Sequence, residues 1–243
     1  MKLIKKYIRP FLAAAIVCIL LLGGQAILEL MLPEYMSRIV NTGLQKGGIE
    51  QTYPEILPAN TLEIFAKYMS DEDRELFTNN YIPLEDLENK DEILKKYPEA
   101  PDNALVISDG LSKKELDALE KAFAKSAYCI YEVYSRNDLL AIDPNDTNQK
   151  IDPTIFIEHD SLFNVPDDEI MAAAEDAQET LVGSIATVFI KGIYDSFGAD
   201  LSGIQNGFIV KAGLAMLALS ALNVACTIGC GGKYSRSLLY RQH

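Results

Sequence analysis

Two long apolar runs lie near opposite ends of the chain, and a polar segment separates them. The first covers residues 11–32 and the second covers residues 208–229, in which Lys211 is the only charged residue. A helix of 22 residues is about 33 Å long, which matches the ~30 Å hydrocarbon core of a bilayer. The pattern therefore predicts two transmembrane helices that form a hairpin and bracket a folded domain.

The segment between the two runs has mostly helical periodicity. Residues 112–135 begin with a capping-box spacing at Ser112 and Glu115, and apolar residues then recur at every third or fourth position. Residues 167–196 form a second long candidate helix, because acidic residues fill its first turn and an apolar face follows. We therefore expect a mainly α fold with a mostly helical central domain and few short strands. The shorter predicted elements are helices at residues 71–80 and 84–97 and strands at residues 104–107 and 154–157.

These patterns divide the chain into five parts. Glu34 and Arg38 form a favourable i,i+4 pair, so the first helix is expected to continue past Pro33. Stretches at residues 41–48 and 198–207 are rich in turn-forming residues and are predicted to join the domain to the helices. The predicted parts are a cytoplasmic elbow segment (1–10), the first transmembrane helix and its extension (11–40), an acidic extracytoplasmic domain (41–206), the second transmembrane helix (207–230) and a short cytoplasmic tail (231–243).

Charge is distributed unevenly along the chain, whose formal net charge is −13. Residues 41–206 contain 33 of the 35 acidic residues but only 13 of the 22 basic ones, and both tails are basic. Because basic flanks of transmembrane helices stay in the cytoplasm, both termini are predicted inside the cell and the central domain outside the plasma membrane. An acidic domain argues against nucleic-acid binding. The partner that the two apolar helices predict is the lipid bilayer.

The N-terminal segment has an alternative interpretation as a cleavable signal peptide. A basic start, an apolar core and small residues at Gly24 and Ala26 fit such a peptide. Apolar residues resume at once after Ala26, however, and a signal peptide does not need that continuation. An uncleaved transmembrane helix is therefore the favoured interpretation, which N-terminal sequencing of the mature protein would decide.

Catalytic and metal-binding motifs are not visible in the chain. The histidines are His159 and His243, and residues 158–161 read as a turn, since a catalytic triad is assembled in space rather than from sequence neighbours. Residues 143–148 resemble a calcium loop but lack the glycine and the bidentate glutamate that such a loop needs. Residues 229–235 fail the phosphate-loop motif at two positions. We therefore expect no catalytic residue, no cofactor and no metal ligand in this chain.

The four cysteines add one constraint. Only Cys129 belongs to the predicted extracytoplasmic domain, so no disulfide forms within that domain. Cys129 lies on the apolar side of a predicted helix and is expected to be a buried thiol. The pair Cys226 and Cys230 has no histidine or acidic neighbours and is not expected to bind metal.

The predicted transmembrane helices carry polar residues that are costly in lipid. Gln25 and Glu29 are four positions apart on the first helix, and Asn223 lies inside the second. Such residues normally face protein or water, so they indicate a helix contact or a translocation path. Glu29 also has a simpler explanation, because near the outer end of its helix its carboxylate reaches the interface. The candidate helix-packing or translocation-path residues are Gln25, Glu29, Ser220, Asn223 and Thr227.

Small residues form a ridge on the second helix. Ala221, Ala225 and Gly229 are spaced by four, which lets another helix approach closely. Two helices cannot cover all of these faces, so we expect the hairpin to belong to a larger bundle of other segments or other chains. The simpler alternative is that the two helices pair only with each other.

The end of the first helix carries a recognisable motif within residues 29–43, ELMLPEYMSRIVNTG. This stretch resembles the end of the first transmembrane helix in bacterial half-size ABC exporters, the multidrug-type permease/ATPase proteins. Residues 1–10 resemble the cytoplasmic elbow helix of that family, and residues 208–229 resemble its second helix less specifically. The residues that carry the main resemblance are Pro33, Ser37, Ile39, Val40, Asn41 and Gly43.

The resemblance implies that the hairpin packs against other transmembrane segments of the same half-transporter or of a partner half in a dimer. The central domain resembles the large extracytoplasmic insert that some Gram-positive members carry between their first two helices. The family has six spans per half and an ATPase domain that binds ATP and Mg, whereas this chain has two predicted spans and no phosphate loop. It is therefore expected to be a truncated permease portion, not an enzyme by itself, whose full-length role is ATP-driven export of an unknown substrate.

Two other functions fit the same pattern. A membrane sensor or receptor input module also places a ligand- or partner-binding domain between two spans, and it requires a signalling helix after the second span. A small accessory membrane protein would bind a partner through its acidic domain. The DNA immediately downstream of the coding region distinguishes the three functions.

Overall fold

The computed structural model describes residues 2–143, 146, 149–151 and 167–239. The chain divides into two compact units, which we call the hairpin unit (Met1–Gly43 with Asn206–His243) and the central domain (Leu44–Gln205). The predicted strand at residues 154–157 and the predicted turn around His159 lie outside the described residues.

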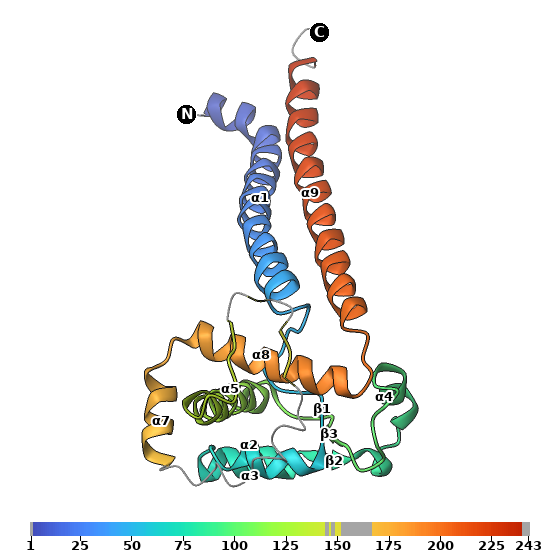
Figure 1. Cartoon of the computed structure of the whole chain (residues 1–243). Helices are drawn as coiled ribbons and strands as arrows, with labels where there is room; N and C mark the ends of the chain where they lie inside the picture. Colours follow the sequence, from blue (N-terminus) through green and yellow to red (C-terminus); the bar gives the residue numbers. More distant parts are fainter. Residues whose placement is uncertain (1, 144–145, 147–148, 152–166, 240–243) are drawn as a thin grey trace. The chain divides into compact units, whose positions relative to one another are not determined.

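Two long helices make up the hairpin unit (Figure 1). α1 spans Lys2–Arg38 and is followed directly by a π-helical segment, Ile39–Gln45, and α9 spans Leu201–Leu239. Each contains a stretch that is long and apolar enough to cross a membrane, Ile16–Gln45 and Leu201–Ile228. By length and composition these helices indicate a membrane protein, since exposed apolar surface on this scale needs lipid or protein against it. The most exposed large side chains, each more than two thirds exposed, are those of Ile19, Leu20, Leu30, Leu217 and Ile228.

The ends of these helices differ in detail from the predicted boundaries. The continuation past Pro33 is confirmed, because helical structure runs on to Gln45. The turn predicted within residues 41–48 is confined to Gly47 and Gly48, whose φ angles are +64° and +80°. These angles strain any residue with a side chain, which explains glycine at both positions.

The central domain is mainly helical, as its periodicity predicts. Its longest helix, α5, spans Lys113–Arg136 and begins with the predicted capping box. The Glu115 N–H donates to Ser112 Oγ at 3.3 Å, and the Ser112 N–H donates to Glu115 Oε2 at 2.7 Å. The other helices among the described residues are α2 (Leu62–Ala66), α3 (Asp71–Asn79), α4 (Lys90–Lys96), α7 (Asp167–Asp176) and α8 (Glu179–Ser196), with 3₁₀ turns at Ala59–Thr61 and Leu84–Asp86.

One small antiparallel sheet completes the described part of the domain. Its strands are β1 (Ile56–Leu57), β2 (Tyr81–Pro83) and β3 (Leu105–Ile107), in the order β1-β3-β2. Val106 pairs with Ile56 on one side and with Ile82 on the other. The mainly α fold class with few short strands is therefore confirmed.

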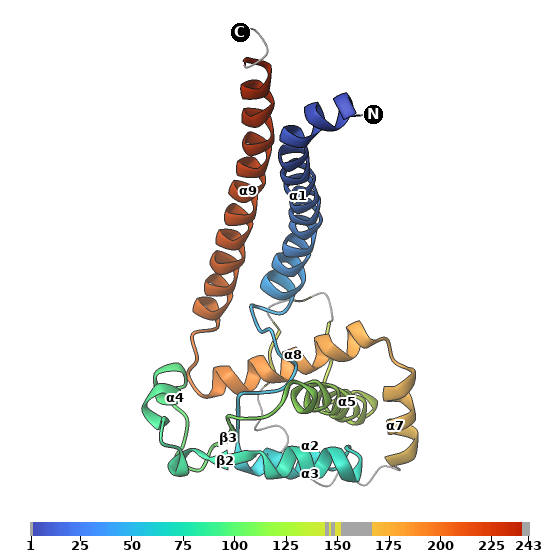
Figure 2. The same ribbon diagram turned by 180° about the vertical axis from the view of Figure 1, so that it is seen from behind.

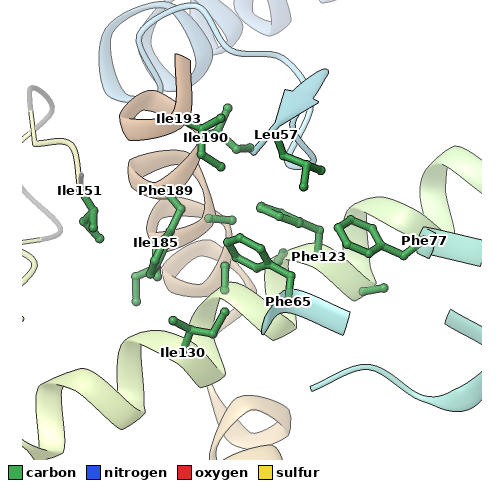
Figure 3. Packing of buried hydrophobic residues seen from close by; sticks show 14 of the residues in the cluster. Leu57, Phe65, Phe77, Phe123, Ile130, Ile151, Ile185, Phe189, Ile190 and Ile193 are labelled. Atoms are coloured by element: carbon green, nitrogen blue, oxygen red, sulfur yellow. The ribbon is translucent and has the colours of Figure 1, made fainter. Parts of the chain in front are cut away.

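α5 lies at the centre of the domain. It packs against α7 and α8 and against α2 and α3, and both views place it between α8 and the α2–α3 pair (Figure 1, Figure 2). Aromatic rings fill the space between these helices (Figure 3). The Phe123 ring of α5 lies 4.7 Å from the Phe65 ring and 6.2 Å from the Phe77 ring, and Phe65 lies 6.1 Å from Phe189 of α8. All four rings are buried, so they contribute both apolar burial and ring-edge contacts.

The prediction of one continuous helix over residues 167–196 is wrong. The chain forms two helices, α7 and α8, with a break at Ala177 and Gln178. Neither glycine nor proline marks this break in the sequence. Gln178 has an extended conformation, with φ −62° and ψ 131°, and the corner lets both helices pack against α5. Tertiary packing here overrides local helix propensity.

The shorter elements were predicted less well. The helix at residues 71–80 and the strand at residues 104–107 are confirmed as α3 and β3. Residues 84–97 contain only a 3₁₀ turn and the two-turn helix α4 instead of one helix. The sequence does not predict β1 and β2, because each contains only two consecutive apolar residues next to a proline, whereas β3 lies in the run of four apolar residues at 104–107.

Residues 198–207 are mostly helical, which corrects their prediction as a turn-rich joint. The turn is made by Gly198, whose φ is +74°, and α9 begins at Leu201. Asp200 stabilises this start, because its Oδ1 accepts a hydrogen bond from the Gly203 N–H at 2.8 Å. Some of the turn-forming residues in this stretch therefore mark the N-terminus of a helix.

Candidate functional site

Three polar side chains meet in the hairpin unit. Gln25 Nε2 donates a hydrogen bond to Glu29 Oε1 at 2.9 Å, one turn further along α1. Asn223 Nδ2 of α9 donates to the same Glu29 oxygen at 3.5 Å. The Glu29 carboxylate thus receives donors from both long helices. We call Gln25, Glu29 and Asn223 the hairpin polar cluster.

The hairpin polar cluster leaves one polar atom unsatisfied. Asn223 Oδ1 is buried and has no hydrogen-bond partner among the described residues. A buried acceptor without a donor costs roughly 1–3 kcal/mol, and the hydrocarbon core contains no water to supply one. A donor from a further helix would remove this cost.

The other polar candidates of α9 are not part of the cluster. Ser220 and Thr227 are exposed. The Thr227 hydroxyl donates to the backbone carbonyl of Asn223 at 3.0 Å, a bond within its own helix that satisfies it locally. The structure therefore brings together three of the five candidate residues and leaves these two on the outside of α9.

The predicted small-residue ridge also lies on an open side of α9. Ala221 and Ala225 are exposed, and the surroundings of Gly229 lie outside the described side chains. Exposed small residues let a second backbone approach a helix closely. This face of α9 is therefore available to a helix from outside the hairpin unit.

Gly43 lies at a close contact within the hairpin unit. It is buried, and a Cβ at this position would lie 3.0 Å from Ile209 Cγ1 and 3.3 Å from Phe208 Cδ1. The Arg38 guanidinium carbon lies 6.0 Å from the centre of the Phe208 ring, at the outer limit of a cation–π contact. Gly43 is also the last residue of the motif in residues 29–43, so that motif ends where the chain contacts α9.

The central domain contains an open pocket with a volume of about 570 Å³. It lies between α5, the corner where α7 meets α8, and the segment that follows Gln45. Small apolar side chains and Gly183 form part of its surface. Its charged residues are three lysines (Lys46, Lys121 and Lys125) and four carboxylates (Asp117, Glu120, Glu175 and Glu179).

Two contacts shape this pocket. Glu120 Oε1 accepts hydrogen bonds from the Thr52 N–H at 2.7 Å and from Thr52 Oγ1 at 3.1 Å, which holds the entering segment against α5. Lys125 Nζ lies 3.9 Å from Glu175 Oε1, and both side chains are more than half exposed. An ion pair of this kind contributes little stability.

No sequence motif indicated this pocket. Its charged residues on α5, such as Asp117 and Lys121, lie on the polar face of that helix, which reads as an ordinary solvent-exposed face. The space beside them lies at the break at Ala177 and Gln178, where the sequence predicts a continuous helix. Alanines at positions 124, 174 and 177 were the one available signal, since they leave room between two helices.

A group of buried tyrosines surrounds the backbone at Glu55. The Glu55 N–H donates to Tyr194 Oη at 2.8 Å, Tyr97 Oη donates to Glu55 Oε2 at 3.1 Å, and Tyr81 Oη donates to the Pro54 carbonyl at 2.6 Å. The Tyr97 and Tyr194 rings are 5.0 Å apart. Burial raises the pKa of Tyr81, Tyr97 and Tyr194 above the ordinary value, so these hydroxyls stay protonated and join β1 to α8.

One lysine is buried beneath the glycine turn. Lys191 of α8 is 6% exposed, and its Nζ donates to the Gln45 carbonyl at 3.4 Å. Burial lowers the pKa of Lys191, and the charge of Asp146 partly opposes that shift. A cation at the end of a helical segment is favourable, so Lys191 stabilises the point where the π-helical segment ends.

The remaining sequence candidates that the structure describes do not form a reactive site. Cys129 is 1% exposed, as predicted, and its Sγ lies 3.8 Å from the Ile170 carbonyl oxygen. In the part of the chain that the structure describes, no group of three or more histidine, cysteine or acidic residues is placed to hold a metal ion. Four residues of the calcium-like stretch at 143–148 lie outside the described residues.

Comparisons of the chain with protein-family models, with curated proteins and with solved structures found no match. A functional conclusion therefore depends on the two sites described above, the hairpin polar cluster and the pocket of the central domain.

Proposed function

We propose that this chain is the N-terminal transmembrane portion of an ABC-type exporter, whose whole assembly exports an unknown substrate at the expense of ATP. The observation that carries the proposal is the motif in residues 29–43 together with the contact at its end. Helical structure continues through Pro33, and Gly43 lies against Phe208 and Ile209 at the start of the apolar part of α9. This arrangement supports the expectation of a first transmembrane helix that extends beyond the bilayer before the chain enters an insert.

The hairpin polar cluster supports a place in a larger helix bundle. Asn223 Oδ1 is buried without a donor among the described residues, and the ridge at Ala221 and Ala225 is exposed. The unsatisfied polar atom is unfavourable in lipid, and the exposed small residues let another helix approach closely. In an exporter the partners are further transmembrane segments of the same half or of a second half in a dimer.

The proposed topology places both termini in the cytoplasm and the central domain outside the plasma membrane. Its support is the basic charge of both tails and the acidic charge of residues 41–206. Cysteine labelling tests it. In intact cells a membrane-impermeant maleimide should label an Asp109→Cys variant, because Asp109 lies on an exposed turn of the central domain. A Lys5→Cys variant should react only after the cells are permeabilised, and the opposite pattern would refute the topology.

Purification from the native host tests the transport proposal itself. The affinity-tagged chain, extracted in a mild detergent, should co-purify with a protein or segment that contains a phosphate loop, and the assembly should hydrolyse ATP. Replacing Asn223 with leucine should reduce recovery of that partner, whereas Leu214→Ala, a control change at an exposed position of α9, should leave recovery unchanged. Recovery of the chain without any ATPase would refute an exporter.

A membrane sensor or receptor input module is the second candidate function. The observation that favours it is the open pocket in the central domain, since receptor input domains bind small molecules in such cavities. The same purification separates the two functions. A receptor should co-purify with, or continue into, a cytoplasmic kinase or methyl-accepting segment instead of an ATPase.

A further inference from the structure

The pocket between α5 and the α7–α8 corner is large enough to hold a small molecule. The proposed role of the hairpin in transport gives this pocket no function. Its volume is about 570 Å³, within the range of ~300–1,000 Å³ that small-molecule sites occupy. Ala124, Ala174 and Val182 line it and are themselves buried. The pocket therefore combines a buried apolar surface with charged side chains around it.

Four of these charged side chains are available to a ligand. Lys46, Lys121, Asp117 and Glu179 make no side-chain hydrogen bond or ion pair with any described residue. The cavity therefore offers two ammonium groups and two carboxylates. Lys46 lies beside α8, where its Nζ would be 3.9 Å from a Cβ on Gly183, whereas Lys121 belongs to α5, so the two lysines come from different walls.

This balance of charges selects a ligand that carries both signs. A purely anionic or purely cationic molecule would meet as many like charges as opposite ones. Over longer distances the field is negative, because residues 41–206 contain 33 acidic and 13 basic residues, and such a field attracts ligands with a positive net charge and repels those with a negative one. A single amino acid would fill only part of a cavity of about 570 Å³.

We propose that this pocket binds a short peptide with a free amino end and a free carboxyl end. Lys46 and Lys121 bind the carboxylate, Asp117 and Glu179 bind the ammonium group, and the peptide side chains rest on the alanine surface. The site is separate from the hairpin polar cluster, and the proposal stands whether the hairpin belongs to an exporter or to a receptor.

Isothermal titration calorimetry of the full chain in lipid nanodiscs tests the proposal, with the tripeptide Lys-Ala-Ala as the probe. The free tripeptide should bind, and its amino-acetylated and carboxyl-amidated forms should each bind about tenfold more weakly, as expected for the loss of one charge-assisted hydrogen bond. The amidated form is the more positive peptide. If the general negative field alone drove binding, this form would bind more tightly than the free tripeptide.

Two substitutions and a matched control place the binding in the pocket. Lys121→Glu should weaken binding of the free tripeptide about tenfold and should not weaken binding of the amidated form, which has no carboxylate for Lys121 to bind. Lys114→Glu makes the same charge change at an exposed position of α5 outside the pocket and should have no more than about a twofold effect. Gly183→Leu should abolish binding, because its side chain would extend into the cavity.

Three results would overturn the proposal. One is the absence of binding by the free tripeptide at millimolar concentration. Another is equal or tighter binding of the amidated form. The third is a loss of affinity in Lys114→Glu as large as that in Lys121→Glu. Circular dichroism of each variant checks that the helices are retained.

Discussion

Two glycines of α8 should respond in opposite ways to the same substitution. At Gly183 an added Cβ would meet only Lys46 Nζ and Thr52 Cγ2, each at 3.9 Å, which is ordinary van der Waals contact. At Gly192 an added Cβ would overlap the carbonyl oxygen of Ile151 and lie 2.6 Å from its carbonyl carbon. Ile151 packs beside α8 in the core (Figure 3). The obstacle at Gly192 is backbone, so no side-chain rotation relieves it.

The expected magnitudes follow from two opposing effects. Alanine is favoured over glycine inside a helix by about 1 kcal/mol, so Gly183→Ala should raise the free energy of unfolding by that amount. Overpacking costs roughly 1–3 kcal/mol, and overlap with backbone puts Gly192→Ala at the upper end, for a net loss of about 2 kcal/mol. One kcal/mol shifts the melting temperature of a domain of this size by roughly 2–4 °C. The two variants should therefore melt roughly 6–12 °C apart.

Cys129 provides a readout that reports on the central domain alone. Its thiol is 1% exposed and becomes reactive when α5 separates from α7. Brief labelling with a maleimide at increasing temperature, followed by mass spectrometry of the peptide that contains Cys129, gives the unfolding midpoint in detergent. This assay is independent of the two long helices, which do not need to unfold.

The outcome at Gly192 is decisive. If Gly192→Ala is stabilised as much as Gly183→Ala, residue 151 does not pack against α8 in the core. If both variants are destabilised, space at Gly183 is smaller than described and the pocket is affected as well.

The remaining predictions concern the cap, the core and the tyrosines. Ser112→Ala should lower the free energy of unfolding by about 1 kcal/mol in the same labelling assay, because it removes the capping box of α5, whereas Ser202→Ala at an exposed position should not. Phe123→Ala should lower the free energy of unfolding by about 3–5 kcal/mol, since the Phe123 ring is fully buried. A decrease smaller than that of Ser112→Ala would contradict the position of this ring at the centre of the core. Because burial raises the pKa of Tyr81 and Tyr194, their contribution to stability should be complete below the unfolded value of about 10 and should decline as pH rises above it. Melting at pH 8 and at a pH above 10 checks this, and a Tyr194→Phe variant should show a smaller decline.

Local signals in the sequence were sufficient for the long helices. The stretch at residues 112–135 contains its own cap and its own apolar stripe, so it predicted α5 to within one residue at each end. The two apolar runs likewise predicted helices long enough to cross a membrane. In each case the information lies within one segment, because helix formation depends on neighbours three and four positions apart.

The hairpin polar cluster was predicted only in part. Gln25 and Glu29 are four positions apart, so their hydrogen bond could be expected from the sequence of α1 alone. The sequence also identified Asn223 as costly in lipid, but it did not determine which polar residue of α9 would face Glu29. That choice depends on the rotation of α9 about its own axis, which follows from packing over its whole length.

The sequence by itself determined the mainly helical class, the two apolar helices, the capped helix α5 and the buried thiol of Cys129, because each follows from periodicity or residue type within a short stretch. Only the tertiary structure decided the corner at Ala177 and Gln178, the strands β1 and β2, the contact of Gly192 with Ile151 and the pocket. These features bring together residues far apart in the chain. Their energies come from packing and close approach between segments, and no local pattern records which segments will meet.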